Sequence, residues 1–394
     1  MKRTAGPALL LIALVLLAFN LRTTVSSLPP LLSRIEGDLG LSGTGAGLLT
    51  ALPVLCMAWF APVAHRLAHR LGGHATALGA VALIGVGNAI RGAAPGDSSM
   101  IVGKTMLFGG TLMAGIGVAV CGVVLPGIVR AHFPRRTGAA SGAYTVAMLV
   151  GASVSSALAV PLGRATGSWH ASLAAWGLPA FLAVLAWLPL ARGSGTTDTG
   201  PATAPGRLPW RSRVAWLLAG FFGLQASIAY AYITWLPAAY ESRGWNAAAA
   251  GALLSLLHAT QLPSALALPA LSDRVGDRRP VLVTAAAASV LGALWLLLVP
   301  GFQPWMAATV LGFGLGGGFA LALVLIVDYS GDSAGSNRLA ALVFFLGYNV
   351  AAIVPALAGA LRDLTGGFAA PWTLLTILAV AQLIVATRLK PGLR

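Results

Sequence analysis

The chain has 394 residues, of which 57% are hydrophobic and only 9% are charged, and its formal net charge at pH 7 is +15. Water-soluble domains carry roughly 25% charged residues, so this composition excludes a soluble globular protein. The two cysteines, Cys56 and Cys121, both fall within apolar runs and predict no disulfide framework. Composition alone therefore indicates a protein embedded in a membrane.

Long runs without charge recur along the chain, and each covers the roughly 20 residues that a helix needs to cross the hydrocarbon core. Only helices and closed barrels satisfy backbone polar groups in lipid, and the runs lack the polar–apolar alternation of barrel strands. We predict an all-α membrane protein with about twelve transmembrane helices. The expected spans are 7–31, 43–67, 75–94, 100–126, 138–162, 172–190, 213–238, 247–270, 280–299, 304–327, 338–361 and 370–388.

The positive charges are distributed unevenly over the predicted loops. With the N-terminus placed in the cytoplasm, 18 of the 25 Lys and Arg residues fall on the cytoplasmic side. This positive-inside bias predicts a multi-pass protein of the inner (plasma) membrane with both termini in the cytoplasm. Because the basicity is accounted for by topology, we expect no nucleic acid as a partner. Arg22 belongs to no predicted loop. The six cations on or near the outer side are Arg34, Arg91, Lys104, Arg164, Arg243 and Arg362.

One polar, Gly/Ser/Thr/Pro-rich stretch at 192–212 is typical of a flexible cytoplasmic linker. It separates residues 1–191 from residues 213–394, and each part holds about six of the predicted spans. The chain is therefore expected to form two six-helix bundles joined by a linker. This layout is typical of transporters whose halves rock around a central site.

The two halves also resemble each other at an offset of roughly 200 residues. "LLAF…SSLPPLLSR" (16–34) parallels "LLAGF…TWLPAAYESR" (217–243), and "APVAHRLAHRLGGH" (61–74) parallels "LPALSDRVGDRR" (268–279). An internal repeat of this kind predicts that the two bundles are related by pseudo-symmetry.

The segment "DRVGDRR" (273–279) resembles the inter-helix loop of the major facilitator superfamily, G-x-x-x-D-R-x-G-[RK]-[RK]. The resemblance implies that this loop takes part in gating between conformations. Its first-half counterpart, "HRLAHRLGGH" (65–74), keeps part of the pattern but has His65 and His69 where Gly and Asp are usual. The matching residues are Asp273, Arg274, Gly276 and Arg278 in the second half, with Pro269 in place of the leading Gly, and Arg70 and Gly72 in the first.

Within that superfamily, short segments spread over both halves are similar to the cyanate permease and 2-nitroimidazole transporter family. The resemblance implies a single-chain secondary transporter with the major facilitator fold, and a small cyanate-like anion or a nitro-bearing compound as substrate. The similar segments are "NLR" (20–22), "AGLLTALPVL" (46–55), "VVLPGIVRAHFPRR" (123–136), "TWLP" (234–237) and "GYNVAAIVP" (347–355).

Arg22 stands inside the first apolar run, roughly ten residues or 15 Å from its expected outer end. One interpretation is snorkelling to the headgroups, but this depth is too great for it. A charge near the bilayer centre costs about 3 kcal/mol, so the side chain should face the interior or a wet cavity. Of the ten acidic residues only Asp328 is placed to be intramembrane, at the cytoplasmic end of its span. A guanidinium fork suits an anion, a nitro or a carboxylate group, so we predict that Arg22 anchors the substrate.

Other polar residues within the spans are candidates for the same substrate site. His258 and Gln261 are three positions apart and share one helix face, and His258 is able to cycle protons near neutral pH. Asp328 is a second candidate for proton coupling. For each residue the alternative is a helix-to-helix hydrogen bond or packing without a transport role. The remaining candidates for substrate contact are Asn20, Tyr144, Gln225, Tyr348 and Asn349.

Several other motifs lack the sequence context that their usual function requires. "GFGLGG" (312–317) has no strand or acidic residue beside it and favours close helix packing. His65 and His69 have metal-ligand spacing, but Arg66 and Arg70 beside them repel a cation. No Walker-type motif is present in the sequence, so ATP is not the expected energy source. We predict no cofactor, no metal and no catalytic residue.

The hypothesis that these patterns favour is a monomeric transporter that moves a small molecule across the bilayer by alternating access. It is secondary active or facilitative, and symport and antiport both stay open. An alternative within transport is a proton-coupled efflux pump for drugs or toxic compounds. The alternative from another class, a membrane-embedded enzyme or a sensor, requires a paired acid and base, a metal set or a sizeable soluble domain, and the sequence offers none of them.

Overall fold

The structure, a computed structural model, describes residues 7–93, 100–134, 136–193, 208–275, 277–330 and 333–390. Every regular element in these ranges is helical, which confirms the all-α class. Eleven of the helices are long and apolar enough to cross a membrane, and a bent pair raises the number to twelve. The predicted count of about twelve spans is therefore confirmed.

By contacts the chain divides into two compact units. Unit 1 comprises Met1–Gly40 and Leu52–Ala202, and unit 2 comprises Leu41–Ala51 and Thr203–Arg394. The division therefore falls inside one helix, α3 (Gly43–Trp59), whose first residues pack in unit 2. The predicted linker 192–212 lies mostly outside the described residues, and so does Gly276.

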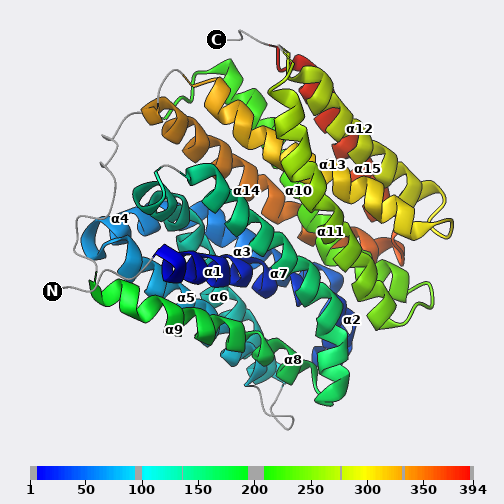
Figure 1. The fold of residues 1–394 in the computed structure, drawn as a ribbon. Coiled ribbons are helices and arrows are strands. Elements are labelled where there is room, and N and C mark those ends of the chain that lie inside the picture. Colours follow the sequence, from blue (N-terminus) through cyan, green and yellow to red (C-terminus); the bar gives the residue numbers. More distant parts are fainter. Residues whose placement is uncertain are drawn as a thin grey trace. The chain divides into compact units, whose positions relative to one another are not determined.

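In unit 1, α1 packs beside α7, and α5 packs between α6 and α9 (Figure 1). Close approach of α5 and α6 rests on glycine, because a Cβ on Gly110 would meet Gly87 O at 2.6 Å. The helices of this unit are α1 (Pro7–Ser26), η1 (Pro29–Leu31), α2 (Leu32–Leu39), the second part of α3, α4 (Ala61–Leu71), α5 (Gly73–Gly92), α6 (Met100–His132), α7 (Thr137–Ala165), α8 (Trp169–Ala175) and α9 (Gly177–Gly193).

In unit 2, α10 packs beside α14, and α13 packs against both α11 and α12 (Figure 1). The glycines of 312–317 make this packing possible: a Cβ on Gly314 would meet Ser289 N at 2.5 Å, and one on Gly316 would meet Ser264 Oγ at 2.5 Å. The predicted role of this motif in close helix packing is confirmed. The helices are α10 (Arg213–Glu241), α11 (Ala247–Ser272), α12 (Arg279–Leu298), α13 (Pro304–Asp328), α14 (Ser333–Thr365) and α15 (Ala369–Arg388).

Prolines shape the two irregular spans. The first apolar helix stops at Ser26 and resumes after the turn at Pro29 and Pro30, because a proline ring removes a backbone N–H and blocks helix continuation. The pair α3 and α4 bends by 56° at Phe60, and Pro62 stands in the first turn of α4. Pro62 has no backbone N–H to donate across the break. The sequence therefore favours a bend at this point.

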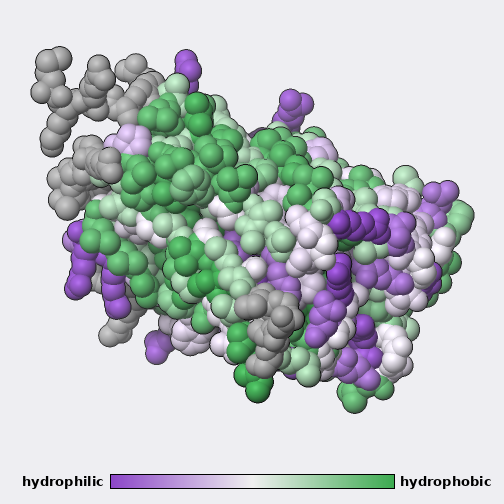
Figure 2. Space-filling view, turned by 90° about the horizontal axis from the view of Figure 1, so that it is seen from below, coloured by the Kyte–Doolittle hydropathy of each residue, from purple (hydrophilic) through white to green (hydrophobic). Residues whose placement is uncertain are grey.

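The helices keep large apolar side chains on their outer surfaces. Figure 2 shows broad apolar stretches on one face of the molecule, with the strongly hydrophilic residues gathered in separate groups. In water such exposure would be unfavourable, but lipid tails are as apolar as these side chains. Exposed examples come from five helices: Ile12, Phe181, Leu291, Ile353 and Ile377.

Candidate functional site

The second half of α1 is a polar segment in an otherwise apolar helix. Asn20 is fully buried and turns back on its own helix, since its Nδ2 donates to Leu16 O at 2.7 Å. Thr23 and Thr24 in turn donate to Asn20 O at 3.2 and 3.4 Å. Arg22 lies within this segment and is half-buried. The Asn20 amide nitrogen and the Thr23 and Thr24 hydroxyls thus donate within their own helix, while the Arg22 side chain stays partly accessible.

Tyr144, the other candidate of unit 1, is half-buried and packs against the apolar core of that unit. Its helix, α7, lies beside α1. The core that it contacts is built from α1, α5, α6 and α9, including Leu17, Ile84, Val118 and Trp187.

In unit 2 the structure brings His258 and Gln261 together on α11. His258 is buried, Gln261 is half-buried, and Gln261 Nε2 lies 3.4 Å from His258 Nδ1. Gln225 of α10 is also buried, and its Nε2 donates to Leu315 O of α13 at 2.9 Å. The amide of Gln225 thus joins α10 to α13, while the His–Gln pair is local to one helix face, as its spacing predicts.

Tyr348 and Asn349 lie in the middle of α14 and are half-buried. The Tyr348 ring packs edge-on against Phe222 of α10, with centroids 5.2 Å apart, and Asn349 Nδ2 donates to Phe345 O at 2.7 Å. The aromatic ring therefore contacts the neighbouring helix. Edge-to-face packing of this kind orients a ring and its hydroxyl.

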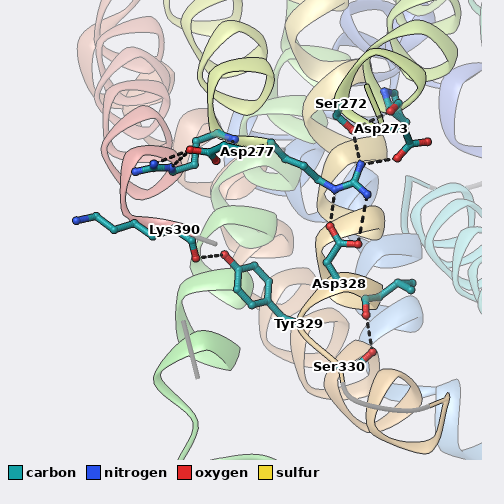
Figure 3. A network of polar contacts seen from close by, with 11 residues as sticks. Ser272, Asp273, Asp277, Asp328, Tyr329, Ser330 and Lys390 are labelled. Atoms are coloured by element: carbon teal, nitrogen blue, oxygen red, sulfur yellow. Dashed lines mark hydrogen bonds and ion pairs between the residues drawn. The ribbon is translucent and has the colours of Figure 1, made fainter. Parts of the chain in front are cut away.

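The inter-helix loop builds an ion-pair network at the ends of three helices of unit 2 (Figure 3). Arg278, at the start of α12, donates through Nη1 to Asp273 Oδ1 at 2.6 Å, and its Nε lies 2.5 Å from Asp328 Oδ2. Asp273 is the C-cap of α11 and Asp328 ends α13. One guanidinium thus ties the ends of α11 and α13 to its own helix. Its hydrogen bond to Asp273 raises the pKa of Arg278 above the usual value.

A second pair strengthens the same region. Arg279 Nε donates to Asp277 Oδ2 at 2.7 Å, and this hydrogen bond lowers the pKa of the Asp277 carboxyl. Nearby, the Tyr329 hydroxyl donates to Lys390 O at 2.7 Å, and burial raises the pKa of Tyr329 (Figure 3). Arg274, the third described residue of the motif beside Asp273 and Arg278, is exposed.

The counterpart in unit 1 carries no such network within the described residues. Arg70 is exposed and forms no ion pair there. Gly72 has a φ of 86°, a conformation that favours glycine, and it connects α4 to α5. The matching Gly72 of the first half therefore serves the turn between two helices.

Three buried polar residues are not among the site candidates that the sequence predicts. The sequence predicts Arg91 on or near the outer side, but the structure buries it with 1% exposure inside unit 1. Gln382 of α15 is fully buried, and its Nε2 lies 3.4 Å from the position of a Cβ on Gly318. His74 Nε2 lies 3.2 Å from His132 Nε2, joining α5 to α6. Each is a lone polar residue at a span end or in an apolar run, a signal that does not distinguish exposure from burial.

These features define a class: a multi-pass helical membrane protein with polar side chains inside its spans and an ion-pair network at its helix ends. The sequence profile described as "Major Facilitator Superfamily" matches residues 10–355. The chain belongs to the major facilitator superfamily, whose members are transporters and not enzymes.

The relatives narrow the placement within the superfamily. The chain is 31% identical to the cyanate transport protein CynX of Escherichia coli K12 over 97% of both chains. It is 31% identical to the 2-nitroimidazole transporter of the same organism, covering 95% of this chain and 93% of the relative. The uncharacterized transporter YycB of Bacillus subtilis 168 is 34% identical, with 95% and 91% covered. The protein is therefore a secondary transporter related to cyanate and nitroimidazole transporters.

The fold is also that of solved transporters. The inward-facing, occupied structure of a bacterial homologue of the human lysosomal transporter Spinster superposes with a TM-score of 0.76, covering 98% of this chain and 97% of that chain. Only 17% of the aligned residues are identical, so this likeness supports the fold alone.

Proposed function

We propose that the protein moves a small anion or a nitro-bearing compound across the membrane by alternating access, with Arg22 as the group that holds the substrate. The observation that carries the proposal is the position of Arg22: a permanently charged side chain, half-buried, in the middle of the candidate membrane span Ala8–Leu39. A charge at such depth is retained where it has a function, because its burial is costly.

The chemistry of the relatives' named substrates fits this anchor. Cyanate is an anion, and a nitro group presents two oxygen acceptors in one plane. The guanidinium offers parallel N–H donors in a planar fork, which suits both groups. A lysine ammonium at the same position would keep the charge and lose the fork.

The remaining polar candidates are proposed as further substrate contacts, each within its own unit. Those from α10, α11 and α14 are buried or half-buried within the spans of unit 2, and Asn20 and Tyr144 lie in unit 1. We assign hydrogen bonding to the substrate to Gln225, Gln261, Tyr348 and Asn349. Their amides and hydroxyl both donate and accept hydrogen bonds, as small polar substrates require.

For proton coupling we favour His258 over Asp328. Asp328 is already engaged by Arg278 at the end of α13, so a proton on its carboxylate would break the ion-pair network. His258 is buried in the middle of α11 beside Gln261 and is the side-chain type that exchanges protons near neutral pH. Uptake measured from pH 5.5 to 8 should lose its pH dependence in His258→Gln and keep it in Gln261→Ala; an unchanged profile in His258→Gln would exclude the assignment.

We also infer that both termini face the cytoplasm, on the basis of the uneven distribution of Lys and Arg. Both native cysteines are buried, so a single introduced cysteine reports its own location. Arg274→Cys should react with a membrane-impermeant maleimide only after the cells are opened. Reaction in intact cells would show the opposite topology, with this loop outside the cell.

Binding to the purified protein tests the anchor. Wild type, Arg22→Lys and Arg22→Ala are compared by isothermal titration with cyanate and with 2-nitroimidazole. We expect affinity to fall about tenfold or more in both variants, since charge-assisted bidentate bonds contribute roughly 1.5–3 kcal/mol. Wild-type affinity in Arg22→Ala would refute the role of this residue. Tyr144→Phe, in the same unit, serves as a milder comparison.

A further inference from the structure

Arg91 is a buried arginine to which the described residues supply no countercharge. It lies in the last turn of α5 with 1% exposure, so its guanidinium is removed from solvent. Its aliphatic stem packs on α6, where a Cβ on Gly110 would meet Arg91 Cγ at 2.8 Å. Among the described residues no carboxylate lies within ion-pair distance of it. An isolated buried charge is among the most costly groups in a protein.

Within the described residues, the guanidinium of Arg91 forms hydrogen bonds through Nη1 only. Nη1 donates to Thr24 O and to Asn88 Oδ1, both at 3.0 Å. Asn88 Nδ2 lies 3.3 Å from Thr24 Oγ1 and 3.4 Å from Trp176 O, so the end of α1, the end of α5 and the junction of α8 and α9 meet here. These contacts hold the side chain in one orientation.

The opposite edge of the guanidinium has no partner among the described residues. Arg91 Nε and Nη2 are both buried and make no hydrogen bond there. These two nitrogens form the side of the fork that binds an acceptor in bidentate fashion. The indole nitrogen of Trp176 and the hydroxyls of Ser26 and Ser27, from the same helix ends, are likewise buried without a partner in the described structure. The unsatisfied groups of this cluster are thus mainly donors.

We propose that the Nε/Nη2 edge of the Arg91 guanidinium binds one small inorganic anion, of the size of chloride or nitrate, inside unit 1. The anion supplies the missing countercharge and accepts from Nε and Nη2. The site is separate from Arg22, and it stands whether or not Arg22 holds the transported substrate. Its role is to fix the end of α1, four residues beyond Asn20, by neutralising the arginine that donates to Thr24 O.

Thermal unfolding of the purified full chain tests the proposal. Sodium chloride or sodium nitrate replaces sodium gluconate at constant ionic strength, because gluconate is too large for a sealed site. We expect the midpoint to rise by about 3 °C or more up to 100 mM chloride, since a ligand that binds only the folded state stabilises it. Equal midpoints of wild type in chloride and in gluconate would overturn the proposal.

Two substitutions locate the effect. Asn88→Asp places a carboxylate 3.0 Å from Nη1 but gives up the Nδ2 contacts with Thr24 Oγ1 and Trp176 O, so the diagnostic result is that it abolishes the response to chloride. Arg91→Gln should abolish the response as well, while Arg22→Gln keeps it. A chloride response that survives in Asn88→Asp would contradict the site. This comparison does not depend on whether Arg91→Gln folds.

Asp97, six positions further along the chain, lies outside the described residues and is the alternative countercharge. If Asp97 neutralises Arg91, wild type shows no response to chloride and Asp97→Asn acquires one, which would refute the anion. We expect the reverse: a response in wild type that Asp97→Asn leaves unchanged.

Discussion

Asp363 caps the start of a helix that is 320 positions away from it in the sequence. One carboxylate oxygen accepts from Gly43 N at 2.9 Å and the other from Thr44 N at 3.0 Å. The N-terminus of α3 is thereby satisfied by a side chain from the end of α14, with the negative charge on the positive end of the helix dipole. Residues 41–51 consequently pack in unit 2, apart from the rest of α3.

Removal of this cap should destabilise the protein. Asp363→Ala leaves two backbone donors of α3 without their acceptor, so we expect a loss of about 1 kcal/mol, or roughly 2–4 °C in the unfolding midpoint. Asp363→Asn keeps an acceptor and should lose less than half of that. If the two variants lose equally, the contact acts through its charge and not as a cap.

Glycine 47 lets α3 approach α14 closely. A Cβ at this position would collide with Pro355 O and the backbone of Ala356, whereas a Cβ on Gly45 would make only ordinary contacts, the nearest at 3.5 Å. Gly47→Ala should therefore cost about 2 kcal/mol or more, as overpacking does. Gly45→Ala should be neutral or stabilising because alanine favours helix. Equal midpoints for the two variants would show that the helices separate freely.

The fork of Arg278 is the element that links three helix ends. Arg278→Lys keeps the charge but replaces the fork, which reaches Asp273 and Asp328 through separate nitrogens, by a single nitrogen, so we expect a lower unfolding midpoint. A double-mutant cycle with Asp328→Asn should give a coupling energy of about 0.5–3 kcal/mol. Arg274→Lys, at an exposed position of the same motif, is the control and should leave the midpoint unchanged. A coupling energy of zero would mean that the pair contributes nothing.

The Asp277–Arg279 pair predicts a dependence on acid pH. The pKa of Asp277 is lowered in the folded state, so the pair stabilises the protein above the unfolded value near 3.8 and this contribution disappears as the pH falls below it. Between pH 5 and 3 the midpoint of Asp277→Asn should therefore fall less steeply than that of wild type. Parallel curves for the two proteins would contradict the assignment.

Much of the fold follows from the sequence because membrane spans are long and apolar. The runs that predict spans correspond to helices, and the pair at 43–67 appears as α3 and α4 with a bend. The end of the first span was less accessible to prediction. The sequence predicts an end at residue 31, but the span runs to Leu39, because after the break at Pro29 and Pro30 the turn η1 and the short helix α2 extend it.

The polar residues show where sequence reasoning stops. His258 and Gln261 meet because both lie on one helix, and spacing alone brings them together. The contact of Arg278 with Asp328 joins residues 50 positions apart and depends on how α11, α12 and α13 pack. Arg91 stands near a predicted loop, where an arginine side chain is usually exposed to solvent. Its burial depends on the packing of α1, α6 and Trp176 around it.

The central claim is that Arg22 holds the transported substrate through its fork. Its most direct test is uptake of isotopically labelled cyanate into liposomes that contain wild type, Arg22→Lys or Arg22→Gln, with equal amounts of folded protein confirmed by size-exclusion chromatography. We predict rapid uptake by wild type, a loss of at least about tenfold in Arg22→Lys, and no uptake above empty liposomes in Arg22→Gln. Wild-type uptake by Arg22→Gln would contradict the claim.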